Sequence, residues 1–130
     1  MTKKTKDILA PISLGELIDK ITILNIKAKH LRGSALDNVK KELSGLESIL
    51  DNLESKIDPI LIQQLMQVNQ KLWEIEDDIR NEERQKRFGE RFIDLARSVY
   101  QQNDVRASLK RKINTTYGSP LTEEKFYPDY

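Results

Sequence analysis

The sequence predicts an all-α protein, an antiparallel bundle of about four helices with heptad-like packing, in which the third and fourth helices are long. Three observations support this prediction. Apolar residues recur at alternating spacings of three and four, the period of an amphipathic helix. The β-branched and aromatic residues follow the same spacing, and no Asn-Gly or Asp-Gly hairpin pair occurs. Capping residues stand where the periodic segments begin and end.

The composition limits the function classes. The chain of 130 residues fits one domain, residues 1–130, with a core of its own. Its 22 Lys and Arg nearly cancel its 21 Asp and Glu, so we do not expect it to bind nucleic acid. Without cysteine and with one histidine, it lacks the residues for a thiolate or histidine-built metal site within one chain. We expect no cofactor.

Neither a membrane span nor a signal peptide is expected. No apolar run approaches the roughly 20 residues of a membrane-spanning helix. The basic N-terminus also lacks the apolar region of a signal peptide. These features favour a cytoplasmic protein without a membrane partner.

The first helix is predicted over residues 13–32, after a flexible arm at residues 1–12. Ser13 and Glu16 have the spacing of a capping box, in which the Ser13 hydroxyl accepts from the Glu16 amide. Gly33 is the predicted stop. One stripe of this helix is apolar and consists of Leu14, Leu17, Ile21, Leu24, Ala28 and Leu31.

The second helix is predicted over residues 35–56 and the third over residues 59–87. The second has a strict heptad pattern, as in a coiled coil, which predicts a narrow seam against a neighbouring helix. That seam consists of Leu36, Val39, Leu43, Leu46, Leu50, Leu53 and Ile57. Asp58 then provides an N-cap, and Pro59 suits the first position of the third helix.

A break near Phe88-Gly89 separates the third helix from the fourth, which is predicted over residues 90–115. No apolar residue occurs from Arg80 to Arg87, and Phe88 lies about 180° out of phase with the preceding stripe. The tail, residues 116–130, holds four of the eight aromatic residues. Free tails are usually poor in aromatic residues, so we expect this one to pack on the bundle or on a second subunit.

Polar residues interrupt the apolar stripe of the fourth helix. Asn103, Arg106 and Lys110 occupy positions between Val99 and Ile113 that the helical period assigns to the core. Burying an amide and two cations is costly unless each finds a partner. The third helix offers such partners, and antiparallel packing predicts a pair of Glu76 with Arg106 or Lys110, of which Arg106 is the expected partner.

The polar cluster has two main interpretations. It is either a structural network that sets the register of the helices or the lining of a small-molecule or anion pocket. Exposure through a frayed or bent helix is a third possibility. The candidate ligand-binding residues are Asn69, Glu76, Arg80, Asn103, Arg106 and Lys110.

A second face of the first helix is a candidate subunit interface. It mixes isoleucines with charged residues, a composition between that of a core and that of a solvated surface. The aromatic tail is the other candidate for this contact. The residues concerned are Asp19, Ile23, Ile26, His30, Phe126, Tyr127 and Tyr130.

Three segments resemble a small all-helical family of bacteria and their phages that has no characterised function. These segments are ISLGELIDKITILNIK, LWEIEDDIR and LARSVYQQNDVRASLKRKIN. The resemblance spans Ile12 to Tyr130 and implies a stand-alone domain. It brings no catalytic or ligand assignment.

The sequence thus favours a non-catalytic protein interaction or assembly module that forms a homo-oligomer or binds a protein partner. The alternative is a small-molecule or anion-binding protein, or an enzyme, with a polar site between the third and fourth helices. No catalytic residue is assigned.

Overall fold

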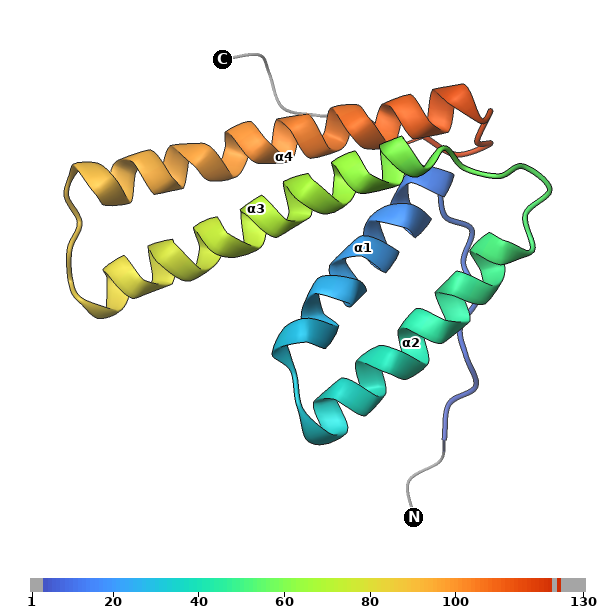
Figure 1. Cartoon of the computed structure of the whole chain (residues 1–130), viewed down its shortest axis with the longest axis horizontal. Helices are drawn as coiled ribbons and strands as arrows, with labels where there is room; N and C mark the ends of the chain where they lie inside the picture. Colours follow the sequence, from blue (N-terminus) through green and yellow to red (C-terminus); the bar gives the residue numbers. More distant parts are fainter. Residues whose placement is uncertain (1–3, 123, 125–130) are drawn as a thin grey trace.

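A computed structural model describes residues 4–122 and 124, and among these it contains four α-helices and no strand (Figure 1). The helices are α1 (Leu14–His30), α2 (Gly33–Asp51), α3 (Pro59–Arg84) and α4 (Glu90–Thr116). At 26 and 27 residues, α3 and α4 are the longest. The predicted all-α class with two long final helices is therefore confirmed.

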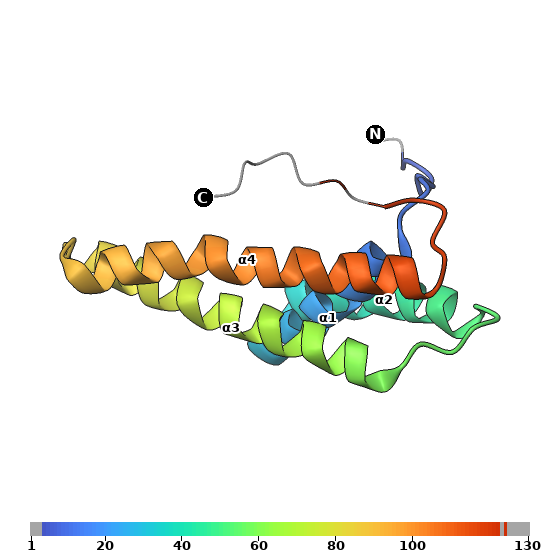
Figure 2. The same cartoon turned by 90° about the horizontal axis from the view of Figure 1, so that it is seen from above.

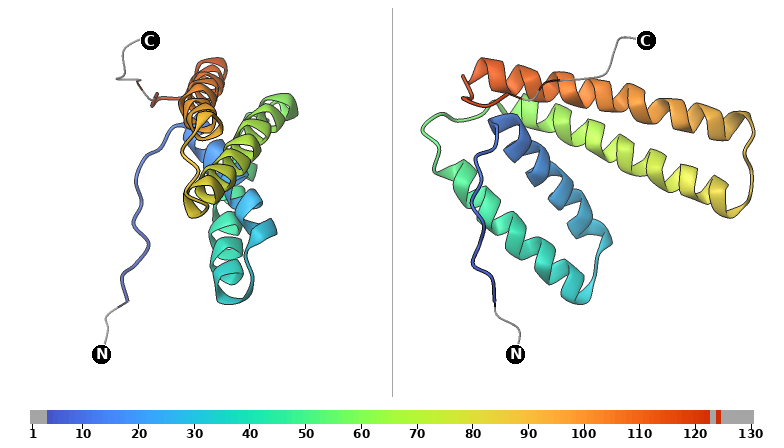
Figure 3. Two further views of the ribbon diagram at one scale, coloured as in Figure 1. Left: turned by 90° about the vertical axis from the view of Figure 1, so that its left-hand side faces the viewer. Right: turned by 180° about the vertical axis from the view of Figure 1, so that it is seen from behind.

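The helices form two hairpins that meet at one end of the molecule (Figure 1). α1 and α2 form the first hairpin, and α3 and α4 form the longer second one. α1 contacts all three other helices, whereas α2 runs beside α1 alone. From above, α1 and α2 lie at one end of the α3–α4 hairpin (Figure 2). The hairpins diverge from their shared end, so the far half of α3–α4 projects beyond α1 (Figure 3).

Two helix starts follow the predicted caps, whereas α2 begins at Gly33, the predicted stop of the first helix. The Ser13 hydroxyl accepts from the Glu16 amide at 3.1 Å, and Asp58 Oδ1 accepts from the Ile60 amide at 2.9 Å. Gly89 is the N-cap residue of α4. The predicted break between the two long helices is confirmed.

α2 is shorter than predicted, because it ends at Asp51 rather than at residue 56. Its antiparallel neighbour α1 begins at Leu14, so a longer α2 would extend past the helix that covers its seam. The last two seam positions therefore lie in the loop after α2. There Ile57 packs against the core, while Leu53 stays 40% exposed.

The turn between α3 and α4 is built around a buried carboxylate. Glu82 accepts from Arg87 Nε at 2.8 Å and from Arg91 Nε at 3.0 Å. The hydrogen bond from Arg87 is the main cause that lowers the pKa of Glu82. Lys86 takes a left-handed φ of 57°, so α3 ends at Arg84 rather than at the predicted residue 87.

The apolar core lies where the two hairpins meet. It is formed by Ile18 of α1, Leu61 and Leu65 of α3, and Ile113 of α4, all of them buried. By contrast, Glu82 is the only buried residue between residues 76 and 109. The far half of the α3–α4 hairpin therefore lacks a closed core of its own.

The described residues before α1 and after α4 differ in structure. Residues 4–12 have no regular secondary structure. Tyr117 packs against the core, and its hydroxyl accepts from the Asp58 amide at 2.7 Å. The predicted contacts of Phe126, Tyr127 and Tyr130 fall outside the described residues.

Across residues 4–122, no helix is both long enough and apolar enough to cross a membrane.

Candidate functional site

A charged network centred on Asp19 joins α1 to α3 and α4. Asp19 lies in the first half of α1, and none of it is exposed. The Arg106 guanidinium on α4 pairs with it through two hydrogen bonds. Nε donates to Oδ1 at 2.9 Å, and Nη2 donates to Oδ2. This bidentate geometry fixes the orientation of both groups.

Asn69 brings the third helix into the network. Its Nδ2 donates to Asp19 Oδ1 and to Thr22 Oγ1, both at 2.8 Å. The Thr22 hydroxyl donates to the main-chain oxygen of Asp19 at 2.7 Å. Asp19, Thr22 and Asn69 are all buried. These hydrogen bonds replace the water that the polar groups lose on folding.

A second ion pair lies beside the first. Lys110 Nζ is 2.6 Å from Glu16 Oε2 and 3.9 Å from Asp19 Oδ2, and Lys110 is only 7% exposed. One turn further along α4, Asn114 Oδ1 accepts from the Gly15 amide at 2.7 Å. Arg106, Lys110 and Asn114 are spaced four residues apart, so they form one stripe of α4 that faces α1.

The network keeps Asp19 ionised. Burial by itself raises the pKa of a carboxyl group. Hydrogen bonds from Arg106 and Asn69, together with the positive charges of Arg106 and Lys110, outweigh burial at Asp19. The pKa of the Asp19 carboxyl is therefore held below its ordinary value of 3.8.

The predicted pair between Arg106 and Glu76 is wrong, because Arg106 pairs with Asp19. Glu76 instead lies 3.5 Å from Arg80 in a largely exposed pair within α3. The prediction failed because α1 contacts both long helices and supplies the carboxylate. One signal was available in the sequence: Ile18, beside Asp19, lies off the predicted apolar stripe, which indicates burial of a wider part of α1.

The predicted interface on α1 is wrong for two of its residues. Asp19 is fully buried and Ile26 is 1% exposed, so neither is available to a second subunit. Both residues are buried because α2, α3 and α4 cover α1. Ile23 is partly buried, and His30 is exposed at the end of the helix.

A pocket of about 370 Å³ opens beside the network, between α1 and the α3–α4 hairpin. It brings together five of the six candidate ligand-binding residues. The exception is Lys110, which faces Glu16 instead. The lining residues are Ile23, Asn69, Leu72, Trp73, Glu76, Asp77, Arg80, Asn103 and Arg106.

Trp73 is the pocket residue whose role the sequence did not indicate. Its indole stacks on the His30 imidazole, with ring centroids 4.7 Å apart and planes 19° apart. Its Nε1 is buried and has no hydrogen-bond partner within the described part of the chain. Its helical spacing from Ile62 and Met66 places Trp73 at the side of the apolar face of the third helix, a position that does not by itself indicate a pocket.

The lining of the pocket is mixed, and its charged side chains are not arranged as a metal site. Two carboxylates, from Glu76 and Asp77, balance the guanidinium groups of Arg80 and Arg106. Among residues 4–122 and 124, no three His, Cys, Asp or Glu side chains are grouped so that they could hold a metal ion. The arrangement presents hydrogen-bonding groups opposite an apolar wall.

The chain belongs to a family of unknown function, DUF6165, whose model matches residues 8–129. No curated protein and no solved structure matches it.

Proposed function

We propose that this protein is a non-catalytic interaction and assembly module, and that the projecting segment, residues 76–105, pairs with the same segment of a second copy. The observation that carries the proposal is the open side of this hairpin. Its two helices pack on each other, yet no apolar side chain between residues 76 and 109 is buried. Two helices that share a half-exposed seam gain stability when another helical pair covers it.

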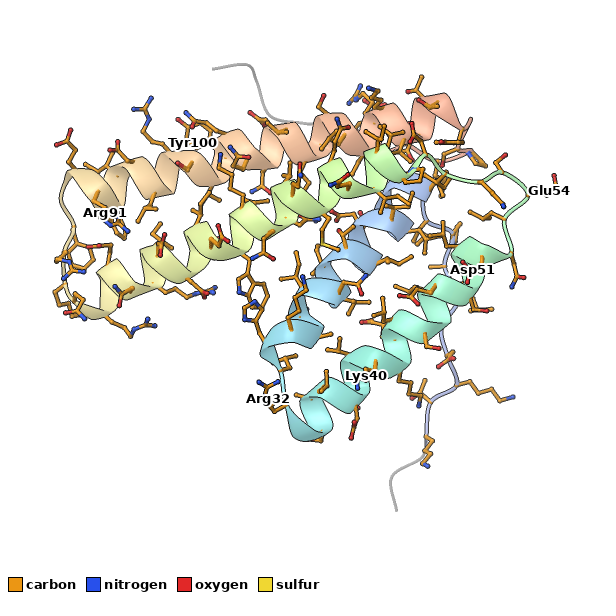
Figure 4. All side chains as sticks on the ribbon, in the orientation of Figure 1. Arg32, Lys40, Asp51, Glu54, Arg91 and Tyr100 are labelled. Atoms are coloured by element: carbon orange, nitrogen blue, oxygen red, sulfur yellow. The ribbon has the colours of Figure 1, made fainter. Side chains whose placement is uncertain are left out.

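Large apolar side chains are exposed on the projecting segment. Phe88 is 51% exposed, Ile93 54% and Tyr100 41%. Ile93 and Tyr100 are seven residues apart on α4, so they lie within about 20° of each other around the helix. Phe88 contacts Phe92 edge-on, with ring centroids 5.4 Å apart. Figure 4 labels Arg91 at the tip and Tyr100 further along α4.

The charge distribution favours a second copy as the partner. Residues 74–83 contain six acidic side chains and one arginine, whereas residues 84–91 contain four basic side chains and one glutamate. Part of this charge is already neutralised, because Glu82 pairs with Arg87 and Arg91 in its own turn. An antiparallel two-fold arrangement places the basic turn of each copy beside the acidic zone of the other. We also propose that the protein is cytoplasmic, the location that the sequence favours.

The test compares two isoleucines of the same hairpin. Ile93→Glu places a charge in the proposed interface. Ile60→Glu places one at the base of α3, where Ile60 is 61% exposed. Size-exclusion chromatography with light scattering at about 100 µM should give the wild type twice the monomer mass of 15.1 kDa. Ile93→Glu should be a folded monomer, and Ile60→Glu should remain a dimer.

Two results contradict the proposal. One is a wild-type protein that is monomeric at that concentration. The other is an Ile93→Glu variant that keeps the dimer mass while its circular dichroism stays helical.

A further inference from the structure

We propose that the pocket beside Asp19 binds a neutral, hydroxyl-rich small molecule such as a sugar, with Trp73 as its apolar wall. The pocket volume of about 370 Å³ lies within the range of small-molecule sites. The pocket shares Glu76, Asp77, Arg80 and Asn103 with the projecting segment, but Ile93 and Tyr100, the exposed apolar residues of the proposed interface, do not line it.

The apolar wall suits the less polar face of a sugar ring. Ile23, Leu72 and Trp73 line this part of the pocket. Stacking on His30 holds the indole of Trp73 in place. An aromatic face carries partial negative charge, so it attracts the polarised C–H groups that a sugar ring presents on one side.

The polar lining suits hydroxyl groups. A hydroxyl donates one hydrogen bond and accepts others, so it needs donors and acceptors side by side. Asn103 offers both through its amide, and Glu76 adds a carboxylate. Asn69 offers only its Oδ1 acceptor, because its Nδ2 already donates to Asp19 and Thr22. Arg106 is already oriented by its bidentate pair with Asp19, which lowers the entropic cost of using it for binding.

The charge balance argues against an anion as the ligand. Both arginines of the lining have a carboxylate beside them, Asp19 for Arg106 and Glu76 for Arg80. Asp77 adds a further negative charge to the lining. A phosphate or carboxylate ligand would have to compete with these groups, whereas a neutral ligand would not.

The test uses the fluorescence of Trp73, the only tryptophan of the chain. The full chain is titrated with D-glucose, N-acetyl-D-glucosamine, maltose and, as the anionic probe, inorganic phosphate. We expect a saturable change with at least one of the sugars, with a Kd of about 1 mM or lower. Phosphate should cause no saturable change.

Matched variants test whether the change in Trp73 fluorescence comes from binding in the pocket. Asn103→Ala, in the pocket, should weaken sugar binding about tenfold or more, equivalent to losing one good polar contact. Gln102→Ala changes the adjacent residue, which lines a separate groove between α3 and α4, and should bind as the wild type does. Ile93→Glu should also bind normally, so failure of the dimer proposal and failure of this one are distinguishable.

The proposal is overturned if none of the three sugars gives a saturable change, or if phosphate binds as well as they do. It is also overturned if Asn103→Ala binds the responding sugar with wild-type affinity.

Discussion

Arg106 and Asp19, which are 87 positions apart in the sequence, form a bidentate ion pair that fastens α4 to α1. The two sides of the pair are unequal: the Asp19 side chain is fully buried, whereas that of Arg106 is 29% exposed. The buried carboxylate therefore needs the ion pair more than the guanidinium does, because water can still reach the guanidinium. Loss of the arginine would leave a buried negative charge with only Asn69 and Lys110 near it.

We expect Arg106→Ala to lower the free energy of unfolding by about 3 kcal/mol. This is the low end of the range for breaking a buried pair, because Asn69 and Lys110 still face Asp19. The matched control is Glu76→Ala, since the Glu76–Arg80 pair is largely exposed and its loss should cost no more than about 0.5 kcal/mol. Urea denaturation measures both values.

Replacing both members of the pair extends this test. Asp19→Leu combined with Arg106→Met removes the buried charge together with its partner, so it should recover much of the lost stability. Some loss should remain, because Asn69 gives up one of its two acceptors. A loss below about 1 kcal/mol for Arg106→Ala alone would show that the pair does not hold the helices together.

The pH dependence of stability should report the Asp19 carboxylate. Its pKa in the folded protein is lower than the ordinary value of 3.8 that it approaches on unfolding. The unfolded chain therefore binds a proton at higher pH than the folded chain does. The stabilisation is complete well above pH 4 and is lost as the pH falls through the folded pKa.

Urea titrations between about pH 7 and pH 2.5 measure this effect. Asp19→Asn should be less stable than the wild type at neutral pH, and its stability should fall less steeply below about pH 5. Asp19→Asn should still lose some stability at acid pH, because the pKa of Glu82 is also lowered. Equal slopes for the two proteins would rule out the assigned role of Asp19.

Gly15 should be the glycine least tolerant of a side chain. A Cβ atom there would lie 2.7 Å from the Lys110 carbonyl oxygen and 3.1 Å from its Cα, so α1 and α4 would have to separate. We expect Gly15→Ala to cost about 1 to 2 kcal/mol, since overpacking outweighs the gain in helix propensity.

Gly45→Ala is the control, because nothing lies within 4 Å of a Cβ atom at that position of α2. There the gain in helix propensity acts alone and should stabilise the protein by about 0.5 to 1 kcal/mol. Thermal unfolding of both variants checks the prediction. A Gly15→Ala protein as stable as the wild type would mean that the two helices are not in such close contact.

Local signals in the sequence were enough to predict the class, the number of helices and most of their ends. Ser13 and Asp58 cap the first turn that follows them, so their effect does not depend on distant residues. The phase reversal at Phe88 likewise predicted the turn between the long helices. Of the three interrupting residues of α4, Arg106 and Lys110 pair with carboxylates of α1, whereas Asn103 is exposed and lines the pocket.

The choice of partners was decided only by the tertiary structure. Helical periodicity places Arg106 on an inward face, but it does not say which helix lies opposite. Because the α1–α2 hairpin crosses the α3–α4 hairpin at one end only, α1 fills the space beside Arg106 and supplies Asp19 in place of Glu76. The same divergence opens the pocket at Trp73 and leaves Ile93 exposed. These features depend on the angle between two hairpins, which is set by packing across the whole chain and by no single segment of it.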